Sequence, residues 1–140
     1  MTLVREARPQ DLEAAERILA ASPEAGRWPG IELAPTRRCL VAEAGGRVIG
    51  FLLAQCPVEE EAEILALAVE PPRRRLGVAT LLLEMFLASR RGRVWLEVRE
   101  SNTAARELYG RRGFVVARRR RWYYQSPSED ALVMQLVLSQ

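Results

Sequence analysis

The chain has 140 residues, of which 49% are hydrophobic and 28% charged, and its formal net charge is +3. These values predict one globular domain over residues 1–140, because a chain of this length can bury a core without disulfides or metals. The longest apolar stretches fall well short of the ~18 residues of a membrane span, and no basic-then-apolar leader opens the sequence. We therefore expect a cytoplasmic protein with no membrane partner.

Two residue types are missing altogether. The sequence has no histidine, which excludes Ser-His-Asp and Cys-His catalysis and paired-His zinc sites. All 21 basic residues are arginine, so lysine Schiff bases and a phosphate-loop lysine are excluded as well. Acid–base chemistry must then fall to Glu, Asp, Tyr, Cys or groups of a substrate. Cys39 and Cys56 have no metal-binding spacing, and we interpret both as small buried apolar residues.

The first half of the chain predicts a helix between strands. The expected elements are a strand at residues 3–6, a helix that opens at 8–11, an irregular segment at 22–35, and strands at 39–43, 47–56 and 64–69. Gly45-Gly46 is a two-residue hairpin signal, which would place Cys39 opposite Leu52 and Cys56 about four residues further along, too far for a disulfide. Four glutamates within residues 59–63 indicate a solvated turn. The continuous apolar run at 64–69 is typical of a strand buried on both faces.

The second half alternates helices and strands. We expect a helix at residues 78–89 with Leu82, Met85 and Phe86 on one side, a strand at 94–98, a helix at 102–112, and strands at 114–124 and 131–138. Strands that alternate with helices predict a mixed sheet with right-handed crossovers and helices on both faces. In such sheets, ligands bind at the carboxyl ends of the central strands.

One candidate site is the turn between the strand at 64–69 and the next helix. Its residues are Arg74, Arg75, Leu76, Gly77, Val78, Ala79 and Thr80. The first main-chain amides of a helix lack internal partners and lie at the positive end of its dipole, so they suit phosphate oxygens. Taken alone, this segment fits a solvated basic turn equally well.

A second candidate site follows the strand at 94–98. Glu97 lies late in that strand, where the local pattern is apolar, and a carboxylate there is either a functional group or part of the sheet rim. Tyr109 follows Asn102 by about two helical turns, so both should project from nearly the same stripe, toward the cleft at the strand ends. Tyr109 on its own is also compatible with a packed aromatic residue.

Together these two segments resemble the Gcn5-related N-acetyltransferase (GNAT) superfamily. The shared pattern is Arg74-x-x-Gly77-x-Ala79 after a strand, with Asn102 and Tyr109 on a later helix. The amino-acid sequence from Leu96 to Tyr109 is similar to that of the RimI-type ribosomal-protein alanine N-acetyltransferases. Gly113-Phe114, Tyr123-Tyr124 and the segment from Glu129 to Met134 share this similarity. The resemblance implies an α/β (α+β) GNAT-like fold, with a mixed, mostly antiparallel sheet of about six to seven strands flanked by three to four helices.

The resemblance also implies a reaction and the residues that serve it. The strand backbone at Leu67, Ala68 and Val69 would lie along the pantetheine arm of acetyl-CoA, and the turn from Arg75 to Thr80 would hold its pyrophosphate. Asn102 would contact the same cofactor. Glu97 would be the general base and Tyr109 the general acid in a direct acetyl transfer that needs no metal. The implied acceptor is the N-terminal alanine of a small-subunit ribosomal protein.

Departures from the family pattern lie where an acceptor peptide would enter. Ala66 replaces a residue that is often polar, Trp28-Pro29 reverses a Pro-Trp order, Trp122 replaces a common Asn, and the loop at 125–128 is about two residues short. A different amine acceptor, on a peptide or a small molecule, therefore remains an alternative. The clustered arginines, with Tyr123 and Tyr124 beside the last cluster, give a third reading, an RNA-binding or ribosome-binding module.

Overall fold

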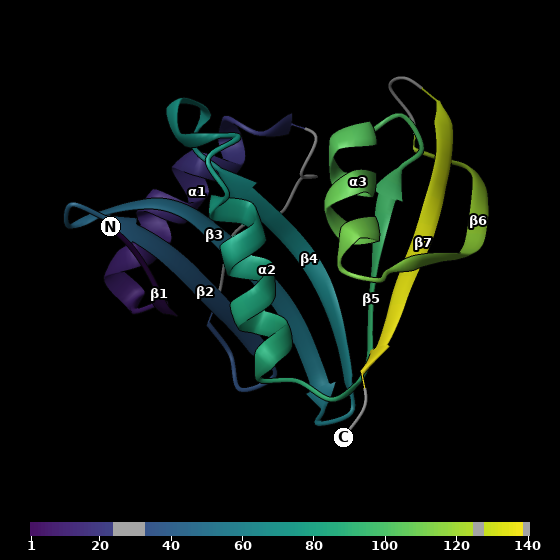
Figure 1. The fold of residues 1–140 in the computed structure, drawn as a ribbon, viewed down its shortest axis with the longest axis horizontal. Coiled ribbons are helices and arrows are strands. Elements are labelled where there is room, and N and C mark those ends of the chain that lie inside the picture. The colour runs from purple at the N-terminus through teal and green to yellow at the C-terminus, as the bar shows by residue number, and fades with distance from the viewer. Residues whose placement is uncertain (24–32, 125–127, 139–140) are drawn as a thin grey trace.

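A computed structural model of the chain describes residues 1–23, 33–124 and 128–138 (Figure 1). In these residues a single seven-stranded sheet has the order β1-β2-β3-β4-β5-β7-β6, and every pair is antiparallel except β4–β5. The strands are β1 (Thr2–Glu6), β2 (Arg37–Ala44), β3 (Arg47–Val58), β4 (Glu61–Val69), β5 (Gly92–Arg99), β6 (Val115–Tyr124) and β7 (Glu129–Leu138). The helices are α1 (Leu12–Ala20), α2 (Val78–Ala88) and α3 (Thr103–Arg111), with single 3-10 turns at Pro9–Asp11 and Pro71–Arg73. The expected mixed, mostly antiparallel sheet is thus confirmed.

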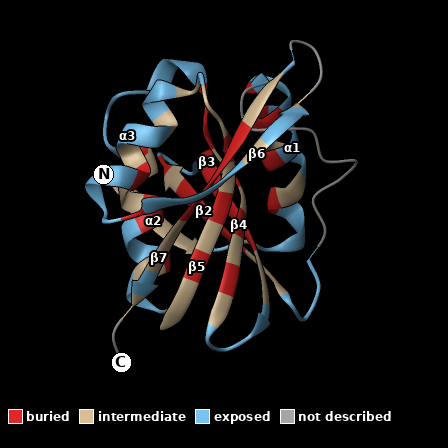
Figure 2. Ribbon diagram, turned by 90° about the vertical axis from the view of Figure 1, so that its right-hand side faces the viewer, coloured by how far each residue is buried: buried red, intermediate tan, exposed pale blue. Residues whose placement is uncertain are grey.

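The helices cover both faces of the sheet. Helix α1 packs Ala15 and Ile18 against Phe51 on one side, which we call the α1 face. Helices α2 and α3 share a second buried cluster on the other side, the α2/α3 face, and in Figure 1 they lie in front of the sheet with α1 behind it. Figure 2 shows the buried residues concentrated in the central strands, whereas β6 is exposed along most of its length. No helix in the described ranges is long and apolar enough to cross a membrane.

One core assignment on α2 was wrong. Leu82 and Phe86 are buried as expected, but Met85 is 47% exposed. Successive helical residues point about 100° apart, and the buried stripe of α2 is centred near Phe86, so Met85 faces solvent.

The hairpin between β2 and β3 confirms the turn but corrects the register. Gly45 and Gly46 both have positive φ, as the turn signal required. A bulge between Ala42 and Glu43 shifts the pairing, so that Cys39 lies opposite Leu53 and not Leu52. Cys39 is buried and Cys56 only partly so, and both are free thiols.

Strand β4 differs from its expected bounds and carries a bulge. It begins at Glu61, so only the first part of the acidic run is a turn. Leu53 pairs with Ala66 and Ala54 with Ile64, which leaves Leu65 as an extra residue. A bulge of this kind bends the strand and strengthens its twist. Leu65 and Leu67 are only partly buried, so the run at 64–69 is less enclosed than expected.

The bulge lies where β4 separates from β5. These two parallel strands pair only from Glu61 and Arg93 to Glu63 and Trp95, and no further rung joins them. Figure 1 shows the two arrows diverging from this point toward their carboxyl ends. The sheet is therefore split into two halves that meet at one end.

The closed end of the split is held tightly. The main-chain N–H of Arg93 donates to the Glu60 carbonyl at 2.8 Å, and a Cβ on Gly92 (φ +81°) would lie 2.2 Å from that same oxygen. The Arg90 guanidinium donates to three carbonyls of the β3–β4 turn, those of Val58, Glu59 and Glu61. These contacts fix the start of β5 against β4.

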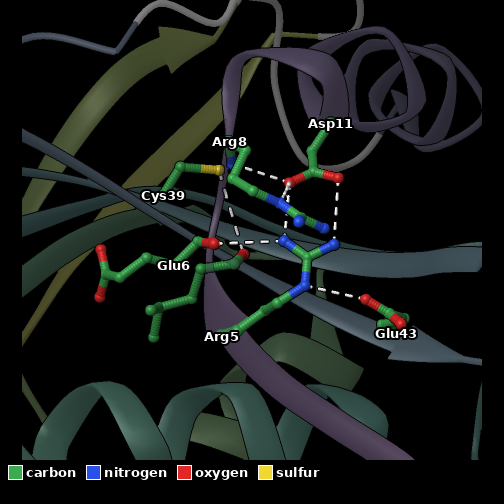
Figure 3. Close-up of polar contacts among 7 residues, drawn as sticks. Arg5, Glu6, Arg8, Asp11, Cys39 and Glu43 are labelled. Carbon is green, nitrogen blue, oxygen red and sulfur yellow. Dashed lines mark hydrogen bonds and ion pairs between the residues drawn. The ribbon is translucent and has the colours of Figure 1, made fainter. Parts of the chain in front are cut away.

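A nearly buried carboxylate joins the first strand to the first helix (Figure 3). Arg5 on β1 donates two hydrogen bonds to Asp11, at 2.7 and 3.1 Å, and the Arg8 main-chain N–H donates a third at 2.7 Å. The Arg5 Nε also donates to Glu43 on β2 at 2.8 Å. Hydrogen bonds and charge from Arg5 hold the pKa of Asp11 below its usual value, against the opposing effect of burial.

We predict that Asp11→Asn lowers the free energy of unfolding at pH 7 by roughly 2–4 kcal/mol, because Arg5 would lose its nearly buried counter-charge. The lowered pKa means that this stability is present above the unfolded pKa and lost as pH falls through the folded value, below about pH 4. Urea denaturation at pH 7 and pH 3 measures both effects. Glu43→Gln, at a more exposed contact, should cost under about 1 kcal/mol; equal losses for the two variants would contradict the assignment.

Candidate active site

The open end of the split exposes main-chain groups of β4. Antiparallel pairing to β3 uses one edge of residues 64–69, with Leu52 opposite Leu67 and Phe51 opposite Ala68. The other edge faces β5, and no described strand pairs with it beyond Glu63. Unpaired N–H and C=O groups of this kind can hold an extended ligand that carries amides. Leu67, Ala68 and Val69, the expected pantetheine contacts, lie on this strand.

The turn that follows β4 presents a row of unpaired amides. Arg75 and Gly77 both have positive φ, +65° and +83°, and Gly77 is the N-cap of α2. The main-chain N–H groups from Arg75 to Thr80 donate to no main-chain carbonyl of the described residues, and no side chain caps the helix. Residues 71–77 are exposed. This turn can therefore accept an anion such as a diphosphate at the positive end of the α2 dipole.

The two arginines of this turn differ in what they contact. The Arg74 guanidinium donates to the Val69 carbonyl at 2.9 Å and to the Ser22 hydroxyl at 2.9 Å, so it ties the end of β4 to the end of α1. Arg75 forms no ion pair within the described ranges. The positive charge of Arg75 is therefore not neutralised by a described carboxylate, while Arg74 holds the turn in place.

Glu97 lies on the α1 face of β5. Its neighbours Leu96 and Val98 belong to the cluster on the α2/α3 face, and strand alternation directs Glu97 to the other side. The side chain is only 14% exposed and accepts a hydrogen bond from Arg120 on β6. The Arg120 guanidinium also lies 4.1 Å from the centre of the Tyr123 ring.

Tyr109 lies on the α2/α3 face, near the end of α3. It is 6% exposed and its ring packs edge-on against Phe114, with 5.4 Å between ring centres. Burial raises the pKa of the phenol, so Tyr109 stays protonated at neutral pH. Its hydroxyl forms no hydrogen bond with the described residues.

Asn102 lies at the start of α3 and Tyr109 near its end, and the side chain of Asn102 is turned back toward the first turn of the helix. Asn102 is the N-cap of α3, and its side-chain oxygen accepts from the Ala105 N–H at 3.2 Å. Capping satisfies one of the open amides at the helix start, which explains the residue type at this position. The amide nitrogen of Asn102 still lies at the carboxyl end of β5, beside the split.

The two expected catalytic residues lie on opposite faces of the sheet. Glu97 lies on the α1 face and Tyr109 is part of the buried cluster on the α2/α3 face. The turn at 74–80 and the N-terminus of α3 both follow the carboxyl ends of the parallel strands that diverge. Both helix N-termini therefore lie at the end of the sheet where β4 and β5 no longer pair.

Two residues near the site had not been predicted. Glu63 was interpreted as part of a solvated turn, although its alternation with the buried Ala62 and Ile64 could have indicated a strand. Arg120 was assigned to a run of largely solvated arginines, but it is the residue that contacts Glu97. Among the positions that depart from the family pattern, Trp122 is exposed and has a positive φ of 56°. Residues 28–29 and 125–127 lie outside the described residues.

Comparison with known proteins assigns the family. A family model described as the acetyltransferase (GNAT) family matches residues 3–114, which is most of the chain. The chain belongs to the GNAT family. The expected GNAT-like fold and the enzyme class are therefore confirmed, and this GNAT protein is an N-acetyltransferase.

Several relatives of this GNAT chain act on a ribosomal protein. The [ribosomal protein bS18]-alanine N-acetyltransferase of Escherichia coli K12 is 40% identical over 100 residues, which cover 67% of each chain. The crystal structure of the ribosomal-protein-S18-alanine N-acetyltransferase from E. coli has a TM-score of 0.86 and 31% identity, and covers 100% of this chain and 96% of that one. Ard1 from Thermoplasma volcanium has a TM-score of 0.77 and 28% identity over 99% of both chains.

The described part of this GNAT chain holds no cluster of three or more side chains that could bind a metal ion. What it offers instead is an amide row at the start of α2, a carboxylate on β5 and a phenol on α3. Those groups can bind an anion, accept a proton and donate a proton.

Proposed function

We propose that the chain transfers the acetyl group of acetyl-CoA to the N-terminal α-amino group of a protein, with the alanine of a bS18-type ribosomal protein as the first candidate acceptor. The observation that carries the proposal is the split between β4 and β5, with a proton acceptor and a proton donor on its two faces. The named relatives that act on bS18 support the choice of acceptor. Acetyl-CoA and new protein N-termini meet in the cytoplasm, which is the compartment we propose.

Acetyl-CoA fits the groups that surround the opening. We place its diphosphate on the amides from Arg75 to Thr80, with the guanidinium of Arg75 as counter-charge. Its pantetheine amides would pair with the free edge of β4 at Leu67, Ala68 and Val69 and so extend into the split. We assign Asn102 to a further contact with the cofactor. The thioester would then lie within the opening, and orienting it there supplies much of the rate acceleration.

In the reaction that we propose, the acceptor amine reaches the thioester from the α1 face. An α-amino group has a pKa near 7.7–8, so a fair fraction is neutral at pH 7. Its nitrogen attacks the carbonyl carbon, and Glu97 takes the proton that the nitrogen loses, through a water. The C–S bond breaks, and the thiolate of CoA takes a proton from the Tyr109 hydroxyl. The products are an N-acetyl amide and CoA.

The acceptor is tested by mass spectrometry on a panel of N-terminal peptides and small amines incubated with acetyl-CoA. We expect acetylation of the α-amino group, fastest on a peptide with the bS18 N-terminus. Acetylation of small amines alone would overturn the assignment to a protein N-terminus.

A thermal-shift measurement separates this enzyme from an RNA-binding module. Acetyl-CoA at a hundredfold excess over Kd should raise the melting temperature by roughly 5–10 °C, because it binds only the folded state. An RNA oligomer should leave the melting temperature unchanged. Stabilisation by RNA at low salt, with none by acetyl-CoA, would favour the arginine clusters as the functional surface.

The turn is tested by Gly77→Ala. A Cβ there has open space, but φ is +83°, so the variant must strain or rearrange the turn at a cost of about 1–2 kcal/mol. We expect acetyl-CoA binding, measured by calorimetry, to weaken about tenfold. Gly46→Ala is the matched control, since it has φ +77° and open space but lies in the β2–β3 hairpin, outside the turn at residues 75–80. Equal affinity in both variants would argue against the turn as the diphosphate site.

The acid is tested by Tyr109→Phe. We expect kcat to fall about 10²-fold or more, because the thiolate would leave without a positioned proton donor, with the Kd for acetyl-CoA unchanged. Tyr123→Phe, which removes a phenol at an exposed position of β6, should retain most of the activity. Unaltered turnover in Tyr109→Phe would exclude its role as acid.

A further inference from the structure

A row of paired residues crosses the sheet at the last rung before the split. Glu63 on β4 pairs with Gln55 on β3 on one side and with Trp95 on β5 on the other. Residues that pair directly across strands have their side chains on the same face, next to each other. Ala62 and Ile64, the neighbours of Glu63, belong to the cluster on the α2/α3 face, so the row lies on the α1 face.

The apolar contacts of helix α1 stop short of this row. The buried cluster beneath α1 contains residues of β2, β3 and β4, and it includes none of β5, β6 or β7. Gln55, Glu63 and Trp95 are each only partly buried. No helix in the described ranges packs over the indole of Trp95, so this stretch of the α1 face is open to a ligand.

Glu63 has no ionic partner, unlike two other carboxylates of the same face. Glu61 pairs with Arg93 at 3.2 Å, and Glu97 accepts a hydrogen bond from Arg120. Glu63 itself forms no hydrogen bond or ion pair with the described residues. Since a partly buried charge has lost part of its water, a cation that joined this carboxylate would stabilise it.

The arginines around Glu63 are engaged elsewhere. Arg37 on β2 attracts Glu63 through its charge, but its guanidinium donates to Gln55 at 2.6 Å. Arg93 lies 5.3 Å from the centre of the Trp95 ring, where it pairs with Glu61 and donates to Gln135 at 2.9 Å. Neither forms an ion pair with Glu63 in the described structure. A cation for this carboxylate would therefore come from outside the described chain.

The row lies next to the proposed base. Trp95 and Glu97 are two residues apart on β5, so they share the α1 face at a separation of about 6–7 Å along the strand. Glu63 is on the neighbouring strand, opposite Trp95. An extended acceptor chain with its amine at Glu97 covers this separation in roughly two residues, since each residue of a strand spans about 3.3 Å.

The chemistry of the row favours a basic side chain. Lysine and arginine have an alkyl stem that packs on an indole ring and a charged end that binds a carboxylate. An acidic side chain would be repelled by Glu63, and a neutral one would leave its charge without a partner. A basic residue is therefore the kind of side chain that Glu63 and Trp95 fit together.

We propose that Glu63, with Trp95 beside it, is a specificity-determining residue that binds a lysine or arginine side chain of the acceptor, at its second or third residue. This inference rests on the proposed function, and it adds a property of the acceptor chain to it. Glu63 takes no part in the chemical step, so its contribution belongs in the KM for the acceptor.

The test uses peptides that begin with alanine and carry arginine, glutamine or glutamate at residue 2, and a second set that varies residue 3 in the same way. For the wild-type enzyme, kcat/KM should be about five- to tenfold higher with arginine than with glutamine at one of these positions, through KM. This is the effect of about one charge-assisted hydrogen bond. Glutamate there should give the lowest kcat/KM.

Two variants of Glu63 and one control complete the test. Glu63→Gln should raise KM for the arginine peptide until it equals that for the glutamine peptide. Glu63→Arg should reverse the preference, so that glutamate becomes better than arginine. Glu61→Gln is the matched control, because this carboxylate lies two residues earlier on β4 and already pairs with Arg93. It should keep the wild-type preference.

Thermal melts distinguish acceptor binding from a structural role. Because Glu63 has no ionic partner in the described structure, Glu63→Gln should melt at the wild-type temperature or above it. A variant that loses the preference without losing stability assigns Glu63 to the acceptor. If Glu63→Arg does not fold, Glu63→Gln and its control decide the question.

Two kinds of failure can be told apart. Equal kcat/KM for the arginine and glutamine peptides in the wild-type enzyme, or a preference that Glu63→Gln retains, would overturn this inference and leave the proposed function intact. Acetylation of small amines with no peptide modified would overturn the proposed function, and this inference with it.

Discussion

The limited pairing between β4 and β5 is the constraint on which the rest of the structure depends. Only three residues of each strand pair, and the bulge at Leu65 then turns β4 away. Contacts of Arg90 and Gly92 keep the closed end joined, so the opening widens in one direction only. Without that separation, β4 would have no unpaired edge at Leu67, Ala68 and Val69 for the pantetheine arm that we propose.

The proposed mechanism needs neither histidine nor lysine. The proposed base and acid need not lie side by side, because each reaches the thioester from its own face. Their surroundings also differ as their roles require. Glu97 accepts a hydrogen bond from the Arg120 guanidinium, whereas Tyr109 is buried among apolar side chains, and this burial raises the pKa of its phenol and keeps it neutral.

Local patterns predicted the elements well, and long-range geometry was harder to predict. Gly45-Gly46 and the apolar periodicities located the hairpin and the helices, since those signals act over a few residues. The bulges at Ala42 and Leu65 have no such signal, so the register of Cys39 and the bend of β4 were missed. Glu63 and Arg120 were missed for a related reason, because each lay in a run of like charges typical of solvent. Only pairing between distant strands brings them to Glu97.

Arg74 links two regions that would otherwise act separately. Its guanidinium bridges the last carbonyl of β4 and Ser22, and the Ser22 hydroxyl in turn donates to the Ile18 carbonyl of α1. An anion seated on the neighbouring amides would immobilise Arg74 through its own main chain. One arginine side chain thus joins the proposed anion site to the C-terminal end of α1 on the other face of the sheet.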